Sequence, residues 1–238
     1  MNFTLRPSKS FLFDLLENQL GKARGQIGLD AASADFKNRF MFQTSKYYGL
    51  DNRLEAIKKG IKKNTDRNCF GIWADMTKLD ALPGGSVDAL VCTNAFVNFS
   101  KDYEVAVNVT RQLSRITAPQ GVFMCQLELD SQFDNIIDVI KSEFKDVKIY
   151  YYRNIISLMY EKIFEKNTHL SNHKIAGSKP FRLFAWLLSR MEFLTCRAKL
   201  GNRQAFVVAR QKNDQQEREF NLTHLKQIEN RLYQLNKQ

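Results

Sequence analysis

Between residues 26 and 152 the chain alternates short apolar runs with segments whose apolar residues recur every three or four positions. The apolar runs are typical of buried strands, and lie at 26–29, 47–50, 69–74, 87–92, 122–127 and 147–152. The intervening segments have the spacing of helices, and include 36–42, 54–59, 103–116 and 133–144. Strict alternation of this kind predicts an α/β fold with a parallel, doubly wound sheet.

The rest of the chain frames this core. We expect an N-terminal helix in residues 1–24, the core in 25–152, a basic and aromatic helical insertion in 153–203, a last strand in 204–212 and a C-terminal helix in 213–238. The apolar residues of the C-terminal helix are spaced three and four apart. That helix either docks on its own domain, which is the simpler interpretation, or forms a homodimer contact.

Positive charge gathers in the last third of the chain. The formal net charge is +11, and residues 151–238 hold 16 of the 36 Lys and Arg but 7 of the 25 Asp and Glu. Within residues 153–203, ten basic residues stand against three acidic ones. Such a surface attracts anionic molecules. Nucleic acid is the less favoured partner, because the sheet domain shows no basic run interleaved with aromatic residues.

Two interpretations of the insertion stay open. Residues 181–194 are too apolar for a free loop and place Trp and Phe beside Arg. The favoured interpretation is a helical lid over the carboxyl ends of the strands, and the second is an interfacial helix in peripheral contact with an anionic membrane. No apolar run reaches the roughly 18 residues of a membrane span. Four widely separated cysteines favour buried free thiols in the cytoplasm, with the inner membrane surface as the alternative location.

Carboxylates follow three successive strands. Asp30, Asp51 and Asp75 each stand where an apolar run ends. In an open α/β sheet ligands bind outside the carboxyl ends of the strands, and an acid about 20 residues past the first loop is placed to bond ribose hydroxyls. A single such Asp is more often a helix cap. Three in succession favour a nucleotide-binding site.

Four ordered segments resemble class I S-adenosylmethionine-dependent methyltransferases, in particular the branch that acts on small molecules and glycans. They are Ile27-Gly28-Leu29-Asp30-Ala31-Ala32-Ser33-Ala34, Tyr48-Gly49-Leu50-Asp51, Trp73-Ala74-Asp75-Met76 and the strand and loop from Ser86 to Phe99. The resemblance covers roughly residues 25 to 130. It implies a Rossmann-like, seven-stranded, mostly parallel sheet in which residues 204–209 lie antiparallel beside the sixth strand.

The resemblance also implies S-adenosylmethionine as cofactor and assigns roles to residues. Asp51 would bind the ribose, Asp75 the adenine amine, and Met76 the adenine ring. Asp30 would brace the loop, and the backbone near Asn94 would accept from the ammonium group. The implied cofactor-binding set is Asp30, Ala31, Ala32, Ser33, Asp51, Asp75, Met76 and Asn94.

The sequence departs from the family at two places. Where the family loop carries glycines, this chain has Ala32, Ala34 and Phe36, so any position that needs a positive φ would be strained. Where the family often has a Glu-His pair, this chain has Val97-Asn98. No catalytic base is therefore assigned.

The function expected from these features is methyl transfer to a small-molecule or sugar-containing, anionic acceptor. The alternative is a non-catalytic nucleotide-binding or nucleic-acid-binding module on the same fold, favoured by the missing glycines and the positive charge. Candidate acceptor contacts are Asn98, Tyr160, Arg182 and Arg190. His169 and His173 are four apart without an acidic or Cys partner nearby, so no metal site is expected.

Overall fold

The computed structural model of the protein describes residues 6–23, 25–99, 102–165 and 179–213. The expected C-terminal helix, with its homodimer contact, and the three histidines lie outside these residues. No described helix is long and apolar enough to cross a bilayer.

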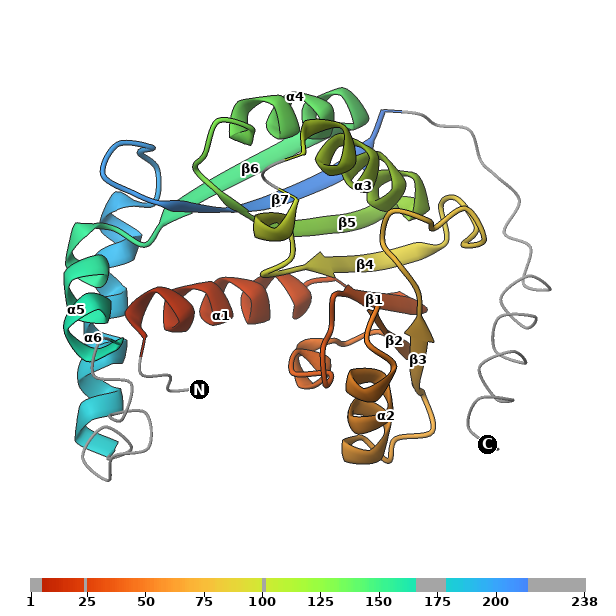
Figure 1. Ribbon diagram of the computed structural model, residues 1–238, viewed down its shortest axis with the longest axis horizontal. Helices are drawn as coiled ribbons and strands as arrows, with labels where there is room; N and C mark the ends of the chain where they lie inside the picture. Colours follow the sequence, from red (N-terminus) through yellow and green to blue (C-terminus); the bar gives the residue numbers. More distant parts are fainter. Residues whose placement is uncertain (1–5, 24, 100–101, 166–178, 214–238) are drawn as a thin grey trace. The chain divides into compact units, whose positions relative to one another are not determined.

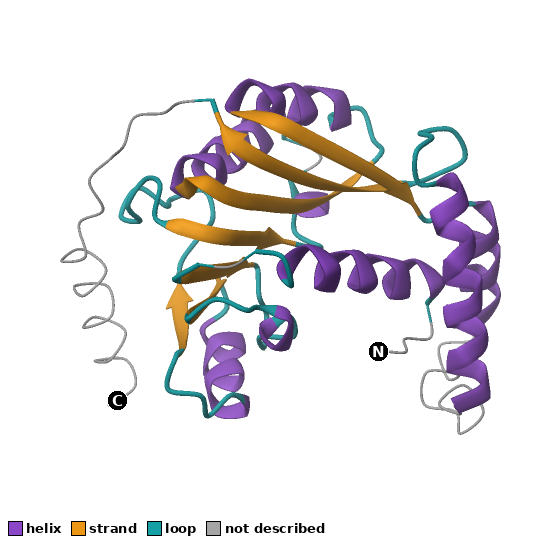
Figure 2. Ribbon diagram, turned by 180° about the vertical axis from the view of Figure 1, so that it is seen from behind, coloured by secondary structure: helices purple, strands orange, loops and turns teal. Residues whose placement is uncertain are grey.

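Seven strands form one mixed, mostly parallel sheet in the order β3-β2-β1-β4-β5-β7-β6 (Figures 1 and 2). The strands are β1 (Ile27–Ala31), β2 (Lys46–Asp51), β3 (Cys69–Trp73), β4 (Val87–Cys92), β5 (Thr117–Glu128), β6 (Phe144–Tyr152) and β7 (Gln204–Lys212). The Rossmann-like fold is confirmed, as is the place of the last strand beside the sixth.

The helices occupy the expected segments, and all but α3 have shifted ends. They are α1 (Pro7–Leu20), α2 (Leu54–Lys63), α3 (Tyr103–Ile116), α4 (Phe133–Glu143), α5 (Ile155–Glu165) and α6 (Lys179–Thr195), with the short 3₁₀ turns η1 (Arg39–Met41) and η2 (Phe96–Asn98). The helix predicted at 36–42 is thus reduced to η1. α2 packs on β2 and β3, α3 packs on β5, and α3 and α4 pack on each other.

The chain divides into two compact units. Unit 1 comprises Met1–Gln19 and Ile149–Phe206, and unit 2 comprises Leu20–Lys148 and Val207–Gln238. Unit 1 therefore joins α1 to α5, α6 and the adjoining parts of β6 and β7. Its boundaries fall inside β6 and β7, and the insertion expected at 153–203 belongs to it.

Unit 2 holds the parallel part of the sheet in regular register. Gly28 to Ala31 of β1 pair with Tyr47 to Leu50 of β2 on one side and with Ala89 to Cys92 of β4 on the other. A register shift follows Val87, which pairs with Thr117, while Ala89 pairs with Val122. Pro119 and Gly121, which are typical turn residues, therefore lie in an irregularity inside β5, and β5 begins earlier than the strand predicted at 122–127.

Candidate functional site

Four neighbouring strands of unit 2 end along one edge of the sheet. Ala31 is in register with Leu50 and with Cys92, and Asp51 is in register with Trp73. The loops after β1, β2, β3 and β4 therefore start side by side. These loops and strand ends carry all the residues of the expected cofactor set: Asp30, Ala31, Ala32, Ser33, Asp51, Asp75, Met76 and Asn94.

The loop after β1 takes a left-handed path without glycine. Ala32, Ala34 and Phe36 have φ values of 57°, 49° and 61°. A non-glycine residue in this region costs on the order of 1–2 kcal/mol. The strain expected at these three positions is confirmed, and other contacts must hold the loop in place.

Asp51 supplies one of these contacts. Its Oδ2 accepts the Ala34 N–H at 2.9 Å, and its Oδ1 accepts the Arg53 N–H at 3.0 Å and Arg53 Nε at 3.2 Å. The Ser33 N–H donates to the Leu50 carbonyl at 2.9 Å. Asp51 is 5% exposed, so its carboxylate ties the β1 loop to the end of β2.

Phe36 supplies another contact, because its ring enters a space that three glycines leave open. A Cβ atom on Gly49 of β2 would overlap the ring, and one on Gly60 of α2 would come within 2.6 Å of it. A Cβ on Gly71 of β3 would lie 3.4 Å from Cζ. We call these residues, Gly49, Gly60 and Gly71, the glycine cradle. The ring is buried and also lies edge-on to Tyr47, with centroids 5.5 Å apart.

Asp30 lies beneath the loop in a buried polar network. Its Oδ1 accepts from Asn38 Nδ2 at 3.2 Å, and its Oδ2 is 3.0 Å from the Tyr47 hydroxyl. Burial raises the pKa of Asp30 from 3.8 to about 7, the two hydrogen bonds lower it, and the nearby Asp51 carboxylate raises it further. Asp30 is 1% exposed. Its carboxylate is hydrogen-bonded to Asn38 and does not face solvent.

The end of β3 is the open part of the edge. Asp75 is exposed, and its Oδ1 accepts the Thr77 N–H at 2.9 Å, while Met76 is buried. Trp73 is 54% exposed, and its Nε1 donates to the Asn52 carbonyl at 3.0 Å. The indole is therefore fixed in orientation with much of its ring exposed to solvent beside Asp51.

The loop after β4 closes the row. Asn94 has a φ of 58°, and its N–H donates at 3.2 Å to Oε1 of the buried Gln126 in β5. Asn98, in η2, is exposed. Its exposed amide is free of the core, and its role as an acceptor contact stays a prediction.

The other three candidate acceptor contacts belong to unit 1. Tyr160 is 6% exposed on α5, and its ring lies 6.1 Å from that of Phe184. Arg190 of α6 forms an ion pair with Asp14 of α1, and its guanidinium lies 4.6 Å from the Trp186 ring. Arg182 lies in α6, but its side chain is outside the described part.

A cluster of three or more His, Cys, Asp or Glu side chains that could hold a metal is absent from the described residues. The four cysteines are free and buried, as expected. Burial raises the pKa of Cys92 and Cys125, so neither is poised as a nucleophile.

Sequence reasoning missed four residues that shape the site: Phe36, Asn38, Tyr47 and Trp73. An aromatic residue in place of a loop glycine, with glycines at 49, 60 and 71, was the available signal for Phe36. Trp73 was visible next to the end of the apolar run at 69–74, where a side chain can leave the core. Nothing local marks Asn38 and Tyr47, because their role depends on meeting Asp30 in the folded chain.

Comparison with known proteins agrees with this geometry. Residues 27–125 match the family model of a methyltransferase domain. No curated protein sequence matches the chain.

Solved structures share the fold at low sequence identity. The [4+2]-cyclase SpnF superposes with a TM-score of 0.58 at 12% identity, over 85% of this chain and 81% of that chain. Geranyl diphosphate C-methyltransferase from Streptomyces coelicolor A3(2), solved with Mg²⁺, geranyl diphosphate and S-adenosyl-L-homocysteine, gives 0.55 at 11%, over 85% and 79%. The N-methyltransferase NodS from Bradyrhizobium japonicum WM9 gives 0.54 at 10%, over 85% and 94%.

The sequence match and the shared fold concern the same part of the chain. Unit 2 supplies the parallel strands, the row of carboxylates and the matched segment 27–125. Residues 27–125 are therefore similar to a methyltransferase domain, and the chain has a Rossmann-like fold that it shares with solved methyltransferases.

Proposed function

We propose that the protein is an S-adenosylmethionine-dependent methyltransferase whose acceptor is an anionic small molecule or a sugar-containing molecule. The observation that carries the proposal is that Asp51, Asp75 and Asn94 lie at or just after the carboxyl ends of β2, β3 and β4. These strands belong to the parallel set β3-β2-β1-β4 within the matched segment. S-adenosylmethionine presents ribose hydroxyls, an adenine amine and an ammonium group. The row offers acceptors for each of these groups.

The ribose would bind at Asp51. A carboxylate has about four lone-pair sites, and three of them are occupied, two on Oδ1 and one on Oδ2. One site on Oδ2 stays open to a hydroxyl. A second opens if the Arg53 side chain, which is 68% exposed, turns away from Oδ1.

The adenine would bind at the end of β3. Oδ1 of Asp75 accepts the Thr77 N–H, which leaves Oδ2 to accept from the adenine amine. The exposed indole of Trp73 offers a flat apolar surface on which the base can stack. Because Nε1 is already bonded to Asn52, stacking would cost Trp73 little side-chain entropy.

Methyl transfer would depend on positioning. Bound S-adenosylmethionine would supply the methyl group and would leave as S-adenosylhomocysteine with the electron pair of the broken carbon–sulfur bond, and Asp51, Asp75 and the backbone near Asn94 would hold it for attack by the acceptor oxygen or nitrogen. The acceptor loses its proton to solvent or to a group of its own, because Val97-Asn98 stands where a base would be. Orientation alone supplies a large share of the barrier reduction in such reactions.

Calorimetric titration of the full chain with S-adenosylhomocysteine tests the cofactor site. Loss of a charge-assisted hydrogen bond costs about 1.5–3 kcal/mol, so we expect Asp51→Asn and Asp75→Asn each to weaken binding roughly 10- to 150-fold. Asp138→Asn, which removes the same charge from an exposed position on α4, serves as control. The absence of both heat and thermal shift in the unchanged protein would overturn the proposal.

The alternative is a module on this fold that binds a nucleotide or nucleic acid without methyl transfer. Its specific support is that Asp51 already accepts three hydrogen bonds, one from Ala34 of the glycine-free loop and two from Arg53. Incubation of cell extracts with the protein and labelled S-adenosylmethionine, followed by mass spectrometry, separates the two. Cofactor binding without any labelled product would favour the alternative, and a labelled product would name the acceptor class.

The choice of acceptor would belong to residues 153–203, the predicted lid, where basic residues outnumber acidic ones. Arg190 is engaged by Asp14 and Trp186, so its reversal would disturb packing. The sharper test reverses the exposed Arg197 and Lys199 to Glu and compares acceptor turnover with cofactor affinity. Lower turnover at unchanged cofactor affinity supports acceptor selection by this segment.

A further inference from the structure

Two helices of unit 1 reverse the usual distribution of polar and apolar side chains. α5 buries Ser157 and Glu161, and α6 buries Ser189 and Glu192. Most of the large apolar side chains described in these helices are exposed to solvent: Ile155, Ile156, Met159 and Ile163 on α5, and Leu183, Phe184, Leu187, Met191, Phe193 and Leu194 on α6. A helix on the surface of a soluble domain normally shows the opposite pattern.

The buried polar residues fix this orientation. Glu161 accepts from Arg153 Nε at 3.0 Å and from the Ser8 hydroxyl of α1. Glu192 accepts the Asn154 N–H at 3.2 Å and the Ser157 hydroxyl. Rotating either helix to bury its apolar stripe would remove these partners and leave a carboxylate unsatisfied. The hydrogen bonds of the buried Glu161 and Glu192 therefore keep the apolar side of each helix facing outward.

The exposed stripe is continuous along each helix. Ile155, Met159 and Ile163 are four residues apart on α5, and Leu187, Met191 and Leu194 follow at helical spacing on α6. Leu194 is 76% exposed and Leu200, in the turn beyond α6, is 92% exposed. Contiguous apolar surface of this kind marks an interaction site. We call this surface the α5–α6 face.

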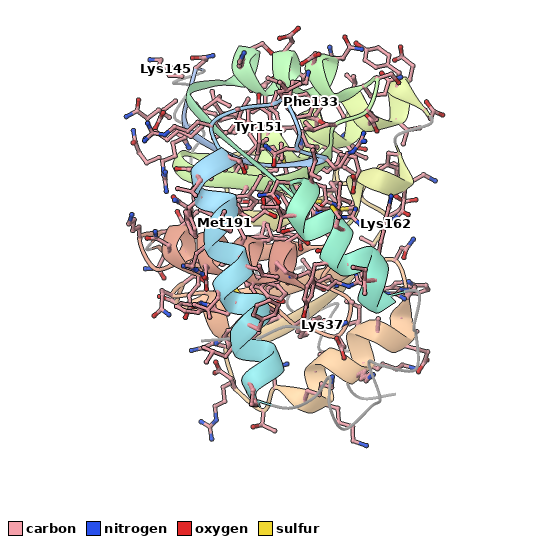
Figure 3. The ribbon with its side chains drawn as sticks, turned by 90° about the vertical axis from the view of Figure 1, so that its left-hand side faces the viewer. Lys37, Phe133, Lys145, Tyr151, Lys162 and Met191 are labelled. Carbon is pink, nitrogen blue, oxygen red and sulfur yellow. The ribbon has the colours of Figure 1, made fainter. Side chains whose placement is uncertain are left out.

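Positive charge borders the α5–α6 face. Lys162 on α5 and Arg197 and Lys199 after α6 are exposed. Residues 153–203 hold three acidic residues, and two of them, Glu161 and Glu192, are buried. Figure 3 shows α5 with Lys162 and α6 with Met191 side by side. The α5–α6 face therefore exposes apolar side chains to solvent, with Lys and Arg side chains at its border.

We propose that the α5–α6 face docks on the surface of an anionic lipid bilayer. The exposed Leu, Ile, Met and Phe side chains would enter the boundary between headgroups and acyl chains, and the Lys and Arg side chains would bind the headgroups. The helices lie on the membrane and do not cross it, because α6 carries Arg190 and Glu192 in its second half. A second copy fits less well, because its identical face would bring like charges together.

This docking goes beyond the proposed function, since lipid binding requires no methyl transfer. If both hold, the bilayer also concentrates amphiphilic anionic acceptors near the protein. Each can fail without the other, because one is measured with vesicles and the other with S-adenosylhomocysteine.

Cosedimentation of the full chain with vesicles tests the docking. We expect binding to phosphatidylcholine vesicles that contain phosphatidylglycerol, weaker binding as salt rises, and little binding to phosphatidylcholine alone. The chain has two Trp residues, Trp73 in unit 2 and Trp186 on α6. In the Trp73→Phe variant, brominated lipids should therefore quench the fluorescence of Trp186.

Matched variants sharpen the test. Leu187→Gln with Leu194→Gln should weaken binding to anionic vesicles at least tenfold, and Phe40→Gln, which alters an apolar residue of unit 2 that is 55% exposed, should not. Arg197→Gln with Lys199→Gln should remove most of the preference for anionic lipid. Lys58→Gln with Lys62→Gln, which takes the same charge from α2, should leave it unchanged.

Three results would overturn the proposal. One is the absence of binding to anionic vesicles, and another is equal loss of binding in the control variants. The third is a dimer in solution that the Leu187 and Leu194 changes convert to a monomer, which would assign the face to a second copy. Unchanged thermal unfolding midpoints in all variants establish that the fold is retained.

Discussion

Glycine usually supplies two properties together, a free backbone and space for a neighbouring side chain. The loop after β1 needs the first property, whereas the glycine cradle opposite it supplies the second. The loop needs left-handed backbone at Ala32, Ala34 and Phe36, yet holds no glycine. The cradle has its glycines on a regular strand, helix and strand, where the backbone needs no positive φ. Glycine is therefore used here for space and not for conformation. The strained conformation is held instead by the Phe36 ring, by Asp51 and by the buried polar network of Asp30.

Removal of the Phe36 ring is the most severe way to break this arrangement. We expect Phe36→Ala to lower the free energy of unfolding by about 3–5 kcal/mol, because the cavity would be lined by backbone that cannot collapse. Urea unfolding followed by circular dichroism measures the loss. A loss below about 1 kcal/mol would show that the loop is held without the ring.

Asp30 gives the next largest effect, visible as pH dependence. Its pKa is about 7 in the folded chain and 3.8 as the ordinary value, so between these pH values the folded state binds a proton that the unfolded state has lost. Stability therefore falls as pH rises through this window, by up to roughly 4 kcal/mol. We expect Asp30→Asn to flatten the dependence and to be more stable than the unchanged protein above pH 7.

The amide can keep both partners, since Oδ1 can accept from Asn38 and Nδ2 can donate to the Tyr47 oxygen. Unfolding measured from pH 4 to 8 in parallel for both proteins makes the comparison. A parallel pH profile in the variant would mean that Asp30 does not carry the dependence.

Adding a side chain to the glycine cradle should lower the free energy of unfolding less than removing the Phe36 ring does. We expect Gly49→Ala to destabilise by about 1–3 kcal/mol through overpacking, because the new Cβ meets the Phe36 ring. In a Phe36→Ala background the same change should be tolerated. Gly201→Ala is the matched control: Gly201 has a φ of 81° and open space around it. Its cost is conformational, so Phe36→Ala should not rescue it. If Phe36→Ala rescued Gly49→Ala and Gly201→Ala equally, the cost at Gly49 could not be assigned to lost space.

The smallest effect concerns the loop backbone. Ala34→Gly should relieve the left-handed strain and change stability by about 1 kcal/mol or less, in the stabilising direction. Ala56→Gly in α2 is the control, and should destabilise by about 0.5–1 kcal/mol, as glycine does inside a helix. Differential scanning calorimetry of both variants resolves the sign. Destabilisation at both positions would show that the loop is not strained.

The fold could be predicted where local pattern and burial agree. The strand at 87–92 and the helix at 103–116 were predicted with their observed ends, because each has a clear apolar period and a turn signal beside it. The start of β5 was wrong, since Pro119 and Gly121 looked like a turn but lie in a bulge that pairing with β4 sustains. Tertiary pairing decided there against local propensity.

The candidate site could be predicted in outline only. Spacing placed Asp30, Asp51 and Asp75 at strand ends, because strand ends follow from periodicity. Which carboxylate faces solvent could not be predicted, as this depends on partners distant in sequence. Asp30 is sealed by Tyr47 and Asn38, while Asp75 stays exposed. The outward-facing apolar stripe of α5 was equally hidden, since periodicity gives a stripe but not the side to which it turns.

Unit 1 is assembled from the two ends of the described chain, with residues 1–19 separated from 149–206 by most of unit 2. Phe11 of α1 packs against Phe193, with ring centroids 4.7 Å apart, and against Tyr152. During synthesis, which proceeds from the N-terminus, α1 emerges before residues 149–206, which hold these partners. Its apolar side chains must wait until well over a hundred further residues have been made. α1 therefore reaches these contacts late, and its side chains stay without them while most of unit 2 is being made.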